Sequence, residues 1–570
     1  MTADAYAVAA VRSAEAAVLA AVPEGSLMQR AAAGLAVVCA RELQAREPRG
    51  RRGRVTGARA VLLVGSGDNG GDALWAGARL AARGARVDAL LLAPQVHAEG
   101  LAALRAAGGR VHEVSGRSGA DLDAAALDAA ALDAAALDAV ALDAVALDAV
   151  ARGVLGRADL VVDGVVGLGG SPGLREPAAS VVAALDALDP RPVVVAVDLP
   201  SGVDPDGGAR PAACVRADVT VTFGALKPGL LLPPAARAAG RVELVDLGLG
   251  PHLPPRPDVD RLTPADAARR WPVPGPDDDK YSRGVVGIVA GSQLYTGAAV
   301  LATGGALRAG AGMVRYVGPP HPTERVRARW PEAVTGPGRV QAWAVGSGVD
   351  PEEPDGDPGS QVHAVLDVLR EAAGRRLPVV VDAGALAVLA RPGVRDLAGD
   401  HLLLTPHAGE LARLLGAWTG TAVARDDVQA RPLDHVRAAV AATGATVLLK
   451  GSVTVIASPD GRVRTQAGAP GWLATAGAGD VLAGVTATLL AAGLDPLDAA
   501  GLAALVHGLA AALASGGPAR GPAGGIGSGA PGGPIVAEDV VTALPDAVRA
   551  LLAGASSTGR GTGPASSRGR

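Results

Sequence analysis

Short apolar runs bounded by Gly, Pro or Asp alternate along the chain with longer segments in which apolar residues recur at helical spacing. The short runs predict buried strands, and the longer segments predict helices that pack on one face. Strands are expected at residues 60–64, 87–92, 110–114, 159–166, 192–197, 218–223, 240–247, 285–290, 340–348, 378–386, 401–404 and 446–449, with a short antiparallel addition at 455–468. Helices are expected at residues 14–41, 73–83, 98–107, 266–271, 298–309 and 535–552. This alternation is typical of an α/β fold with parallel sheets.

The length of the chain predicts two domains, because 570 residues are too many for one hydrophobic core. A proline-rich stretch at residues 250–257 is typical of an interdomain linker. The expected organisation is a first domain at residues 1–250, a linker at 251–262, a second domain at 263–553 with a flexible Gly/Pro insertion at 516–534, and a disordered tail at 554–570.

Residues 121–150 repeat every five residues, and each leucine of the repeat is followed by Asp. A step of five residues turns a helix by about 140°, so the leucines do not form one stripe. We predict a tandem expansion of a surface helix that takes no part in the chemistry. The repeated leucines are Leu122, Leu127, Leu132, Leu137, Leu142 and Leu147.

The composition of the chain indicates which binding partners and which cellular compartment to expect. A net charge of −4 gives no reason to expect nucleic acid. The two cysteines, Cys39 and Cys214, lie far apart in the sequence, which fits a reducing cytosol better than a disulfide framework. No signal peptide opens the chain, and the most apolar windows carry Asp, Arg or several Gly. We expect a cytoplasmic protein without a membrane partner.

The most informative stretch is residues 472–493. Small residues at 474–479 precede apolar residues at helical spacing, which predicts a glycine-rich turn that opens a buried helix near Asp480. The unpaired N–H groups of residues 477–479 would bind an anion such as phosphate. A carboxylate would repel that phosphate unless it takes a proton from the hydroxyl group that attacks it. The alternative is an acidic first turn that only stabilises the helix.

Polar side chains also mark strand ends in the first half of the chain. The strand at 60–64 runs into GSGDNGGD at 65–72, which contains Asn69, and Asp163 and Asp198 lie at or beside the ends of two later strands. Because the carboxyl ends of parallel strands meet at one edge, we expect these loops to form one crevice. Each Asp would otherwise cap its own turn.

Three basic side chains are further candidates. Lys227 would balance a substrate phosphate or lie solvated in its loop. His407 is a ligand candidate at the start of a helix for which Thr405 is the predicted N-cap. Lys450 would lie beside Asp480 if the strands of the second sheet are parallel and sequential.

The ordered motifs resemble the family of bifunctional NAD(P)H-hydrate repair enzymes. The epimerase half is matched by SLMQRA, GSGDNGGD, VDGVVGLGG, VDLPSGVDPDG and TFGALKPGL. The dehydratase half is matched by DKYSRG, AGSQLYTGAA, GAGMVRY, VVDAGAL, LTPHAGE, LLKGSVTVI and WLATAGAGDVLAG. The resemblance implies an N-terminal Rossmann-like three-layer αβα domain followed by a C-terminal ribokinase-like α/β domain.

The resemblance also implies the reactions. NADH or NADPH that has taken up water at C6 of the nicotinamide ring is useless as a hydride donor and exists as R and S epimers. The first domain would interconvert the epimers of these hydrates, NADHX and NADPHX, as an isomerase. The second domain, a lyase, would dehydrate the S form with ADP as co-substrate and release AMP and phosphate. K⁺ is expected in the epimerase domain, Mg²⁺ in the dehydratase domain, and a homo-oligomer in solution.

The family's site residues carry over onto matching positions. In the epimerase domain, K⁺ would be bound by Asn69, Asp163 and Ser201. Asp163 is the preferred proton carrier because it lies at the end of a strand. The hydrate would be bound by Asp68, Asn69, Gly70, Gly71, Asp72, Gly167, Leu168, Gly169, Gly170, Ser171, Pro172, Gly173 and Asp198.

In the dehydratase domain, the resemblance implies that Asp480 is the general base and that Gly477, Ala478 and Gly479 hold the phosphate. The hydrate would contact Ala298, Gly348, His407 and Asp480. The nucleotide would contact Lys450, Gly451, Ser452, Val453 and Thr454 as well as Gly479.

Two positions depart from the family's pattern. Gly384 replaces a usual acidic residue, and Asp68 replaces a usual Asn, which adds a negative charge beside the K⁺ site. Two other functions stay open at this point. One is a ribokinase-like vitamin or sugar kinase fused to a Rossmann-like domain, and the other is a repair enzyme whose N-terminal half only binds or scaffolds.

Overall fold

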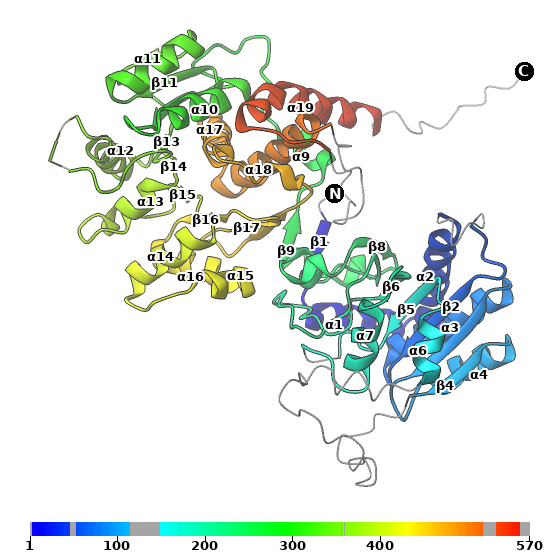
Figure 1. Cartoon of the computed structure of the whole chain (residues 1–570). Helices are drawn as coiled ribbons and strands as arrows, with labels where there is room; N and C mark the ends of the chain where they lie inside the picture. Colours follow the sequence, from blue (N-terminus) through cyan, green and yellow to red (C-terminus); the bar gives the residue numbers. More distant parts are fainter. Residues whose placement is uncertain are drawn as a thin grey trace, which may run out of the picture. The chain divides into compact units, whose positions relative to one another are not determined.

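The computed structural model in Figure 1 describes residues 3–45, 53–114, 149–169, 172–354, 356–357, 359–516 and 532–558. These residues form two compact units, an N-terminal unit that comprises Ala5–Pro257 and a C-terminal unit that runs from Asp258 onward and includes residues 3 and 4. Nearly all of the predicted repeat at 121–150, most of the insertion at 516–534 and most of the tail at 554–570 lie outside the described residues.

The N-terminal unit contains a seven-stranded parallel sheet with the order β4-β3-β2-β5-β6-β7-β8. The strands are β2 (Arg59–Val64), β3 (Arg86–Leu91), β4 (Arg110–Glu113), β5 (Leu160–Gly164), β6 (Val193–Val197), β7 (Val219–Phe223) and β8 (Arg241–Val245). The order reverses between β2 and β5. In sheets of this kind the loops at such a reversal leave a crevice where ligands bind.

Helices cover both faces of this sheet. They are α1 (Val8–Leu19), α2 (Ser26–Ala45), α3 (Asp68–Ala82), α4 (Ala98–Ala106), α6 (Ala149–Leu155), α7 (Ala178–Asp186) and α8 (Pro228–Leu231). Leu62 of β2 belongs to the same core cluster as residues of α1, α2, α3 and α4, whereas its neighbours Val61 and Leu63 pack with α6 and α7. Alternate side chains of one strand therefore face two helical layers, and the predicted three-layer αβα domain is confirmed.

Two local predictions for this unit need correction. The single helix predicted at 14–41 is two helices, α1 and α2, separated by a turn in which Gly25 has a φ of 75°. The GSGDNGGD segment is only partly a loop, because α3 already begins at Asp68. Both errors arise where the apolar spacing runs smoothly through a boundary that backbone geometry sets.

The C-terminal unit contains an eleven-stranded sheet with the order β1-β9-β18-β17-β16-β15-β14-β13-β10-β11-β12. The strands are β1 (Ala3–Ala5), β9 (Val259–Arg261), β10 (Val285–Val289), β11 (Met313–Val317), β12 (Val334–Thr335), β13 (Ala342–Val345), β14 (Val379–Val381), β15 (Leu402–Leu404), β16 (Thr446–Leu449), β17 (Thr454–Ala457) and β18 (Val463–Gln466). The strands from β10 to β16 pair in parallel, and β17 and β18 add antiparallel, as predicted. Since β9 (Val259–Arg261) pairs with β18, the last residues of the linker predicted at 251–262 belong to the sheet of the C-terminal unit.

Helices lie on both sides of this sheet, with α10, α17, α18 and α19 on one side and α12, α13, α14 and α16 on the other (Figure 1). The helices are α9 (Pro264–Arg270), α10 (Thr296–Arg308), α11 (Pro320–Arg329), α12 (Gln361–Arg375), α13 (Gly384–Leu389), α14 (Ala408–Thr419), α15 (Arg425–Ala430), α16 (Pro432–Thr443), α17 (Ala478–Ala491), α18 (Pro496–Ala514) and α19 (Ala537–Thr558). Helix α17 is central and packs directly on α10. A Cβ atom on Gly484 would lie 2.1 Å from the carbonyl oxygen of Ala302, so only glycine permits this approach.

Helix α18 is the one helix in the described part of the chain that is long and apolar enough to cross a membrane. About 67% of its most apolar window is buried inside the C-terminal unit. Its Leu502 and Val506 are fully buried and belong to the same core cluster as Val485 of α17. The helix therefore packs as a core element of this domain.

Candidate active sites

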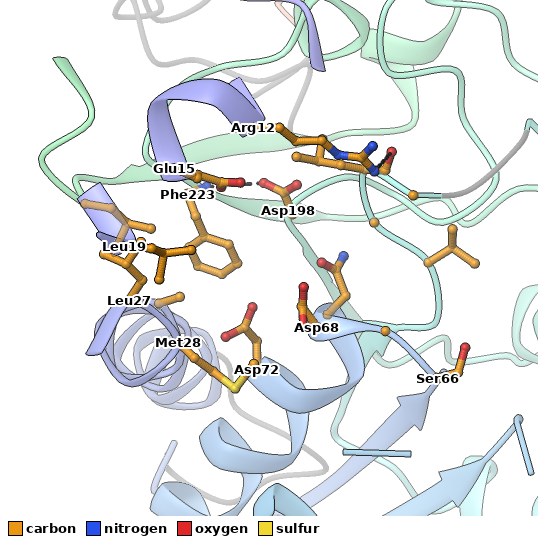
Figure 2. A pocket seen from close by; sticks show the side chains of 18 of the residues that line it. Arg12, Glu15, Leu19, Leu27, Met28, Ser66, Asp68, Asp72, Asp198 and Phe223 are labelled. Carbon is orange, nitrogen blue, oxygen red and sulfur yellow. Dashed lines mark hydrogen bonds between the residues drawn. The ribbon is translucent and has the colours of Figure 1, made fainter. Parts of the chain in front are cut away.

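The N-terminal unit has a cavity of about 630 Å³ at the carboxyl edge of its sheet, where the strand order reverses (Figure 2). Its wall consists of the turn after β2, the start of α3, the segments after β5 and β8, the ends of β6 and β7, and helices α1 and α2. We call this space the N-terminal cavity. The crevice predicted from the strand ends is therefore present.

Close packing of backbone segments shapes the base of this cavity. A Cβ atom on Gly65 would lie 1.9 Å from the carbonyl oxygen of Val165, so the segments after β2 and β5 touch. A Cβ atom on Gly167 would lie 2.3 Å from Oδ1 of Asn69, whose Nδ2 donates a hydrogen bond to the carbonyl of Val197 at 2.6 Å. Asn69 therefore joins the ends of three neighbouring strands, β2, β5 and β6.

Asp163 lies beneath the cavity, not on its wall. The side chain is fully buried, and Ser201 donates to it through both its backbone N–H, at 2.8 Å, and its hydroxyl group, at 2.6 Å. Burial raises the pKa of Asp163 to about 6, against the lowering effect of these hydrogen bonds. The wall of the cavity contains neither Asp163 nor Ser201. This position does not suit the predicted role of Asp163 as the proton carrier, because a substrate in the cavity would not reach its carboxylate.

Lys227 is neither solvated nor available to a phosphate, so both predictions for it are wrong. Its ammonium group is 1% exposed and forms an ion pair with Asp198, with further hydrogen bonds to the Thr222 hydroxyl and the Phe223 carbonyl, both at 3.1 Å. Asp198 adopts a φ of 68°, unusual for a residue with a side chain, and lines the cavity. Lys227 therefore holds this carboxylate in place from below.

The predicted hydrate-binding residues divide into two groups. Those on the cavity wall are Asp68, Asn69, Asp72, Gly167, Leu168, Gly169 and Asp198. Gly70, Gly71, Pro172 and Gly173 lie outside the wall, and Gly170 and Ser171 fall outside the described residues. Gly71, for example, packs against Met28 and His97.

In the C-terminal unit, polar side chains gather at the carboxyl ends of four consecutive parallel strands, β13 to β16. Asp382, which follows β14, is 2% exposed and accepts three hydrogen bonds. The donors are Nζ of Lys450 at 2.8 Å, the hydroxyl of Thr405 at 2.8 Å and the hydroxyl of Ser347 at 2.9 Å. The carboxylate of Asp382 thus fixes one side chain from each of the ends of β13, β15 and β16.

The turn that opens α17 lies beside this network, as predicted. Gly477 is the N-cap of α17 with a φ of 86°, and a Cβ atom there would lie 2.4 Å from Cδ1 of Leu301. The Cα of Gly479 faces Lys450, because a Cβ atom on it would lie 3.4 Å from Nζ. A bound phosphate could therefore meet the first N–H groups of α17 and the ammonium group of Lys450 together.

Asp480 is placed in the first turn of α17, where its charge is costly. Burial raises the pKa of its carboxyl group to about 7, and the neighbouring Asp382 raises it further, whereas Lys450 and a hydrogen bond with Ser347 act in the opposite direction. A carboxyl group that titrates near neutrality is suited to proton transfer.

Two family profiles match the chain, one described as YjeF-related protein N-terminus over residues 24–229 and one as NAD(P)H-hydrate dehydratase over residues 286–521. The bifunctional NAD(P)H-hydrate repair enzyme Nnr of Mycobacterium tuberculosis is 45% identical over 503 residues, which cover 87% of this chain and 90% of that protein. The chain belongs to the family of bifunctional NAD(P)H-hydrate repair enzymes. The predicted family is confirmed, and the alternative of a kinase fused to a binding domain is not supported.

Two further relatives and one solved structure are similar to this chain. The Nnr protein of Mycobacterium leprae is 44% identical over 510 residues, 88% of this chain and 92% of that protein. The NAD(P)H-hydrate epimerase of Microbacterium testaceum is 42% identical over 252 residues, 44% of this chain and 80% of that protein. The crystal structure of the ADP/ATP-dependent NAD(P)H-hydrate dehydratase of Bacillus subtilis, co-crystallised with ATP/Mg²⁺, is 26% identical with a TM-score of 0.42 and covers 51% of this chain and 98% of that one. Since the two family profiles match residues 24–229 and 286–521, the N-terminal unit is the epimerase domain and the C-terminal unit is the dehydratase domain.

The other predicted residues of the dehydratase domain adjoin Ser347 or Lys450, along the chain or through a neighbouring residue. Ala298 and Gly348 face each other, since a Cβ atom on Gly348 would lie 2.6 Å from that of Ala298. Lys450 pairs with His407 through an isolated β-bridge. The segment Gly451, Ser452, Val453 and Thr454 forms the turn into β17, in which the side chain of Val453 is buried and points away from solvent.

His407, not Thr405, is the N-cap of α14. Its Nδ1 accepts hydrogen bonds from the N–H groups of Gly409 and Glu410, at 3.0 and 3.1 Å. Thr405 is buried and donates to Asp382 instead. Thr405, a hydroxyl residue three positions before the first residue of α14, was predicted as the cap, but at the end of β15 its side chain is turned inward.

The departure at Gly384 has a steric reason. A Cβ atom there would lie 2.1 Å from the carbonyl oxygen of Val349, so the backbone of this enzyme leaves no room for an acidic side chain. The departure at Asp68 adds an exposed carboxylate at the rim of the N-terminal cavity, where it raises the pKa of the neighbouring Glu15 and Asp72.

We expect the rate of the dehydratase reaction to depend on pH through Asp480. A general base must be ionised, so kcat/KM for the hydrate should rise as the pH rises, with a midpoint near the pKa of about 7. The measurement is the initial rate of ADP-dependent recovery of reduced nicotinamide from the S hydrate across roughly pH 6 to 8. A rate that is flat or falls over this range would speak against Asp480 as the base.

Proposed function

We propose that this enzyme interconverts the R and S hydrates of NADH and NADPH in its N-terminal domain and dehydrates the S form in its C-terminal domain at the expense of ADP. The observation that carries the proposal is Asp480 at the glycine-lined start of α17, beside the network of Asp382 and Lys450, in a chain whose halves match both halves of the repair family.

In the dehydratase domain, Asp480 takes the proton of the C6 hydroxyl while the hydroxyl oxygen attacks the β-phosphorus of ADP, and AMP leaves. The N–H groups at the start of α17 stabilise the negative charge of the transferred phosphoryl group. Lys450 neutralises the charge that develops on phosphate oxygens. The C6–O bond of the phosphate ester then breaks, a proton leaves C5, and the double bond between C5 and C6 restores the dihydropyridine ring.

Nucleotide-bound Mg²⁺ suits this domain better than a protein-bound metal. The described residues contain no group of three or more acidic, His or Cys side chains arranged to hold a metal ion. Asp382 is occupied by three donors, among them Lys450. Mg²⁺ would therefore enter on the phosphates of ADP, whose charge it neutralises.

K⁺ fits the donor set of the epimerase domain. Asn69 on the cavity wall and the buried Asp163 and Ser201 offer an amide, a carboxylate and a hydroxyl oxygen, and hard cations prefer such ligands. The ion would supply a fixed positive charge below the substrate. We expect replacement of K⁺ by tetramethylammonium to slow epimerisation at least about tenfold, roughly the effect of losing one charge contact. Dehydration of purified S hydrate in the same buffers is the control, and equal loss of both activities would contradict a K⁺ site in the epimerase domain.

The experiment that tests the proposed function is incubation of the full chain with an R,S mixture of NADH hydrate and ADP. Absorbance of the reduced nicotinamide reports the product. Complete recovery means that both domains work, and recovery that stops at the S fraction means that the epimerase domain is idle. No recovery would refute the proposal. ATP in place of ADP, and NADPH hydrate in place of NADH hydrate, measure the preference for nucleotide and substrate.

We also propose a cytoplasmic location and a homo-oligomeric state. Both cysteines, Cys39 and Cys214, are buried and free, which suits a reducing compartment. Sedimentation velocity on the purified chain measures the oligomeric state directly, and a sedimentation coefficient of a 570-residue monomer at all concentrations would contradict the proposal.

A further inference from the structure

Helix α1 closes one side of the N-terminal cavity with side chains that lie outside all of the family motifs. Arg12, Glu15 and Leu19 follow one another at spacings of three and four residues and all line the cavity (Figure 2). The guanidinium group of Arg12 is tied to the carbonyl of Leu168 at 3.1 Å. Glu15 is therefore the carboxyl group that α1 contributes to the cavity.

Asp72 of α3 contributes a carboxyl group from another side of the cavity (Figure 2). It is 6% exposed, and its Oδ1 has no hydrogen-bond partner among the described residues. A buried polar atom without a partner costs free energy unless a bound molecule satisfies it. The orphaned oxygen of Asp72 therefore indicates that a ligand with a hydrogen-bond donor or a labile proton belongs in this cavity.

The other carboxylates near the cavity are less suited to carry protons. Asp198 is held by the buried ammonium group of Lys227. Asp163 lies below the wall and is engaged by Ser201. Asp68 is exposed at the rim. Glu15 and Asp72 are left as the carboxyl groups that face the enclosed part of the cavity.

The electrostatic surroundings favour proton exchange by both groups. Burial raises the pKa of Glu15 and raises the pKa of Asp72 well above its usual range. The charged groups that face Glu15 are Lys227, Asp198, Asp68 and Arg12, and those that face Asp72 are Asp198, Asp68 and Glu15.

We propose that Glu15 is a catalytic acid–base residue of the epimerase domain and works with Asp72 on the opposite side of the bound nicotinamide ring. The inference rests on the proposed epimerase function of this domain. Inversion at C6 requires a hydroxyl group to leave one face of the ring and to return to the other. One group must donate a proton on the first face, and a second group must accept a proton on the other.

The protonated carboxyl group donates its proton to the C6 hydroxyl, the C6–O bond breaks, and water leaves while the lone pair of N1 forms a double bond to C6. The cavity carboxylates stabilise the resulting iminium cation. A water molecule then adds to C6 from the other face, the N1–C6 double bond returns its electron pair to N1, and the ionised carboxylate takes the proton of that water. The two carboxyl groups have exchanged protonation states, and the reverse reaction uses them in the opposite roles.

The test uses the full chain with Glu15→Gln, purified R hydrate and ADP. We expect kcat for epimerisation to fall at least about 100-fold with little change in KM, because a general acid–base group contributes about that much. The low-pH limb of the rate profile should also disappear, and Glu15→Asp should restore part of the rate. Glu99→Gln is the matched control, because Glu99 is an exposed residue of α4 outside the cavity. Dehydration of purified S hydrate by the same preparations measures the amount of active chain.

Exchange of oxygen with the solvent separates the outcomes. Wild-type enzyme in H₂¹⁸O without ADP should place ¹⁸O at C6 as fast as it interconverts the epimers, and Glu15→Gln should slow both processes equally. Interconversion by Glu15→Gln at the wild-type rate would overturn the role of Glu15. Wild-type enzyme that does not interconvert the epimers at all would instead refute the proposed function. If the thermal unfolding midpoint of Glu15→Gln is lower than that of the wild type, Glu15→Asp is used in its place. The pH profile of Glu15→Asp then decides whether Glu15 is the acid–base residue.

Discussion

Asp480→Asn is expected to slow ADP-dependent dehydration of the S hydrate by about 10²–10⁴-fold, the range that general bases contribute. Asn keeps the size and a hydrogen bond with Ser347 but cannot accept the proton of the C6 hydroxyl. The N–H groups at the start of α17 and the ammonium group of Lys450 remain in place, so ADP should bind with an affinity within about threefold of that of the wild type. Single-turnover rates measure the first effect and isothermal titration with ADP the second.

The same substitution should not destabilise the dehydratase domain. Burial raises the pKa of Asp480 to about 7 in the folded protein, above that of an unfolded Asp, so between about pH 4 and pH 7 the folded state holds the proton more tightly. The stability of the wild-type domain therefore falls as the pH rises through this window, because above it an ionised carboxylate must stay buried. Asn carries no charge, so at pH 8 the variant should unfold at an equal or higher urea concentration than the wild type.

Asp434→Asn is the matched control for Asp480→Asn. Asp434 occupies the third residue of α16, as Asp480 does in α17, but it is exposed and takes no part in the hydrogen-bond network of Asp382. We expect Asp434→Asn to retain the wild-type rate. If Asp480→Asn retains more than a tenth of the wild-type rate while Asp434→Asn behaves normally, proton abstraction by Asp480 is not the chemistry of this domain.

The features that the sequence predicted correctly depend on local chemistry. The turn at Gly477 was predictable because a run of small residues cannot fill a core and the apolar spacing begins directly after it. The crevice around Asn69 was predictable because strand, glycine-rich loop and helix follow each other along the chain, and parallel strands bring their carboxyl ends together. Both inferences need only the order of elements and their polarity.

The features that the sequence did not predict depend on tertiary placement. Lys227 and Asp198 are 29 residues apart, and nothing in their spacing indicates that they form a buried pair. Glu15 lies on a helix that carries none of the sequence motifs, and only the fold places it on the cavity wall. Asp163 ends a strand, as predicted, yet Ser201 covers it, so its depth below the cavity was not available from the pattern. In each case the three-dimensional neighbours, not the local sequence, decide the role.

Lys227→Met is expected to destabilise the epimerase domain by about 3–5 kcal/mol, the usual cost of leaving one partner of a buried ion pair without the other. The ammonium group of Lys227 and the carboxylate of Asp198 are 1% and 6% exposed, so water cannot replace the lost partner. Epimerisation should be lost with it, because Asp198 would be displaced from the cavity wall or protonated. The dehydratase domain has its own core and should keep its activity.

The double variant Lys227→Met/Asp198→Asn distinguishes charge from packing. It removes the orphaned carboxylate, so its epimerase domain should recover most of the stability that Lys227→Met loses, and the coupling energy of the cycle should exceed about 1 kcal/mol. In the wild type, the loss of each activity with urea measures the stability of the domain that carries it. Trp75 is the only tryptophan before residue 258, so its fluorescence reports unfolding of the epimerase domain in variants that lack epimerase activity. If the double variant is no more stable than Lys227→Met, the methylene stem of Lys227 stabilises the domain by packing, and the ion pair is not what holds Asp198 at the cavity.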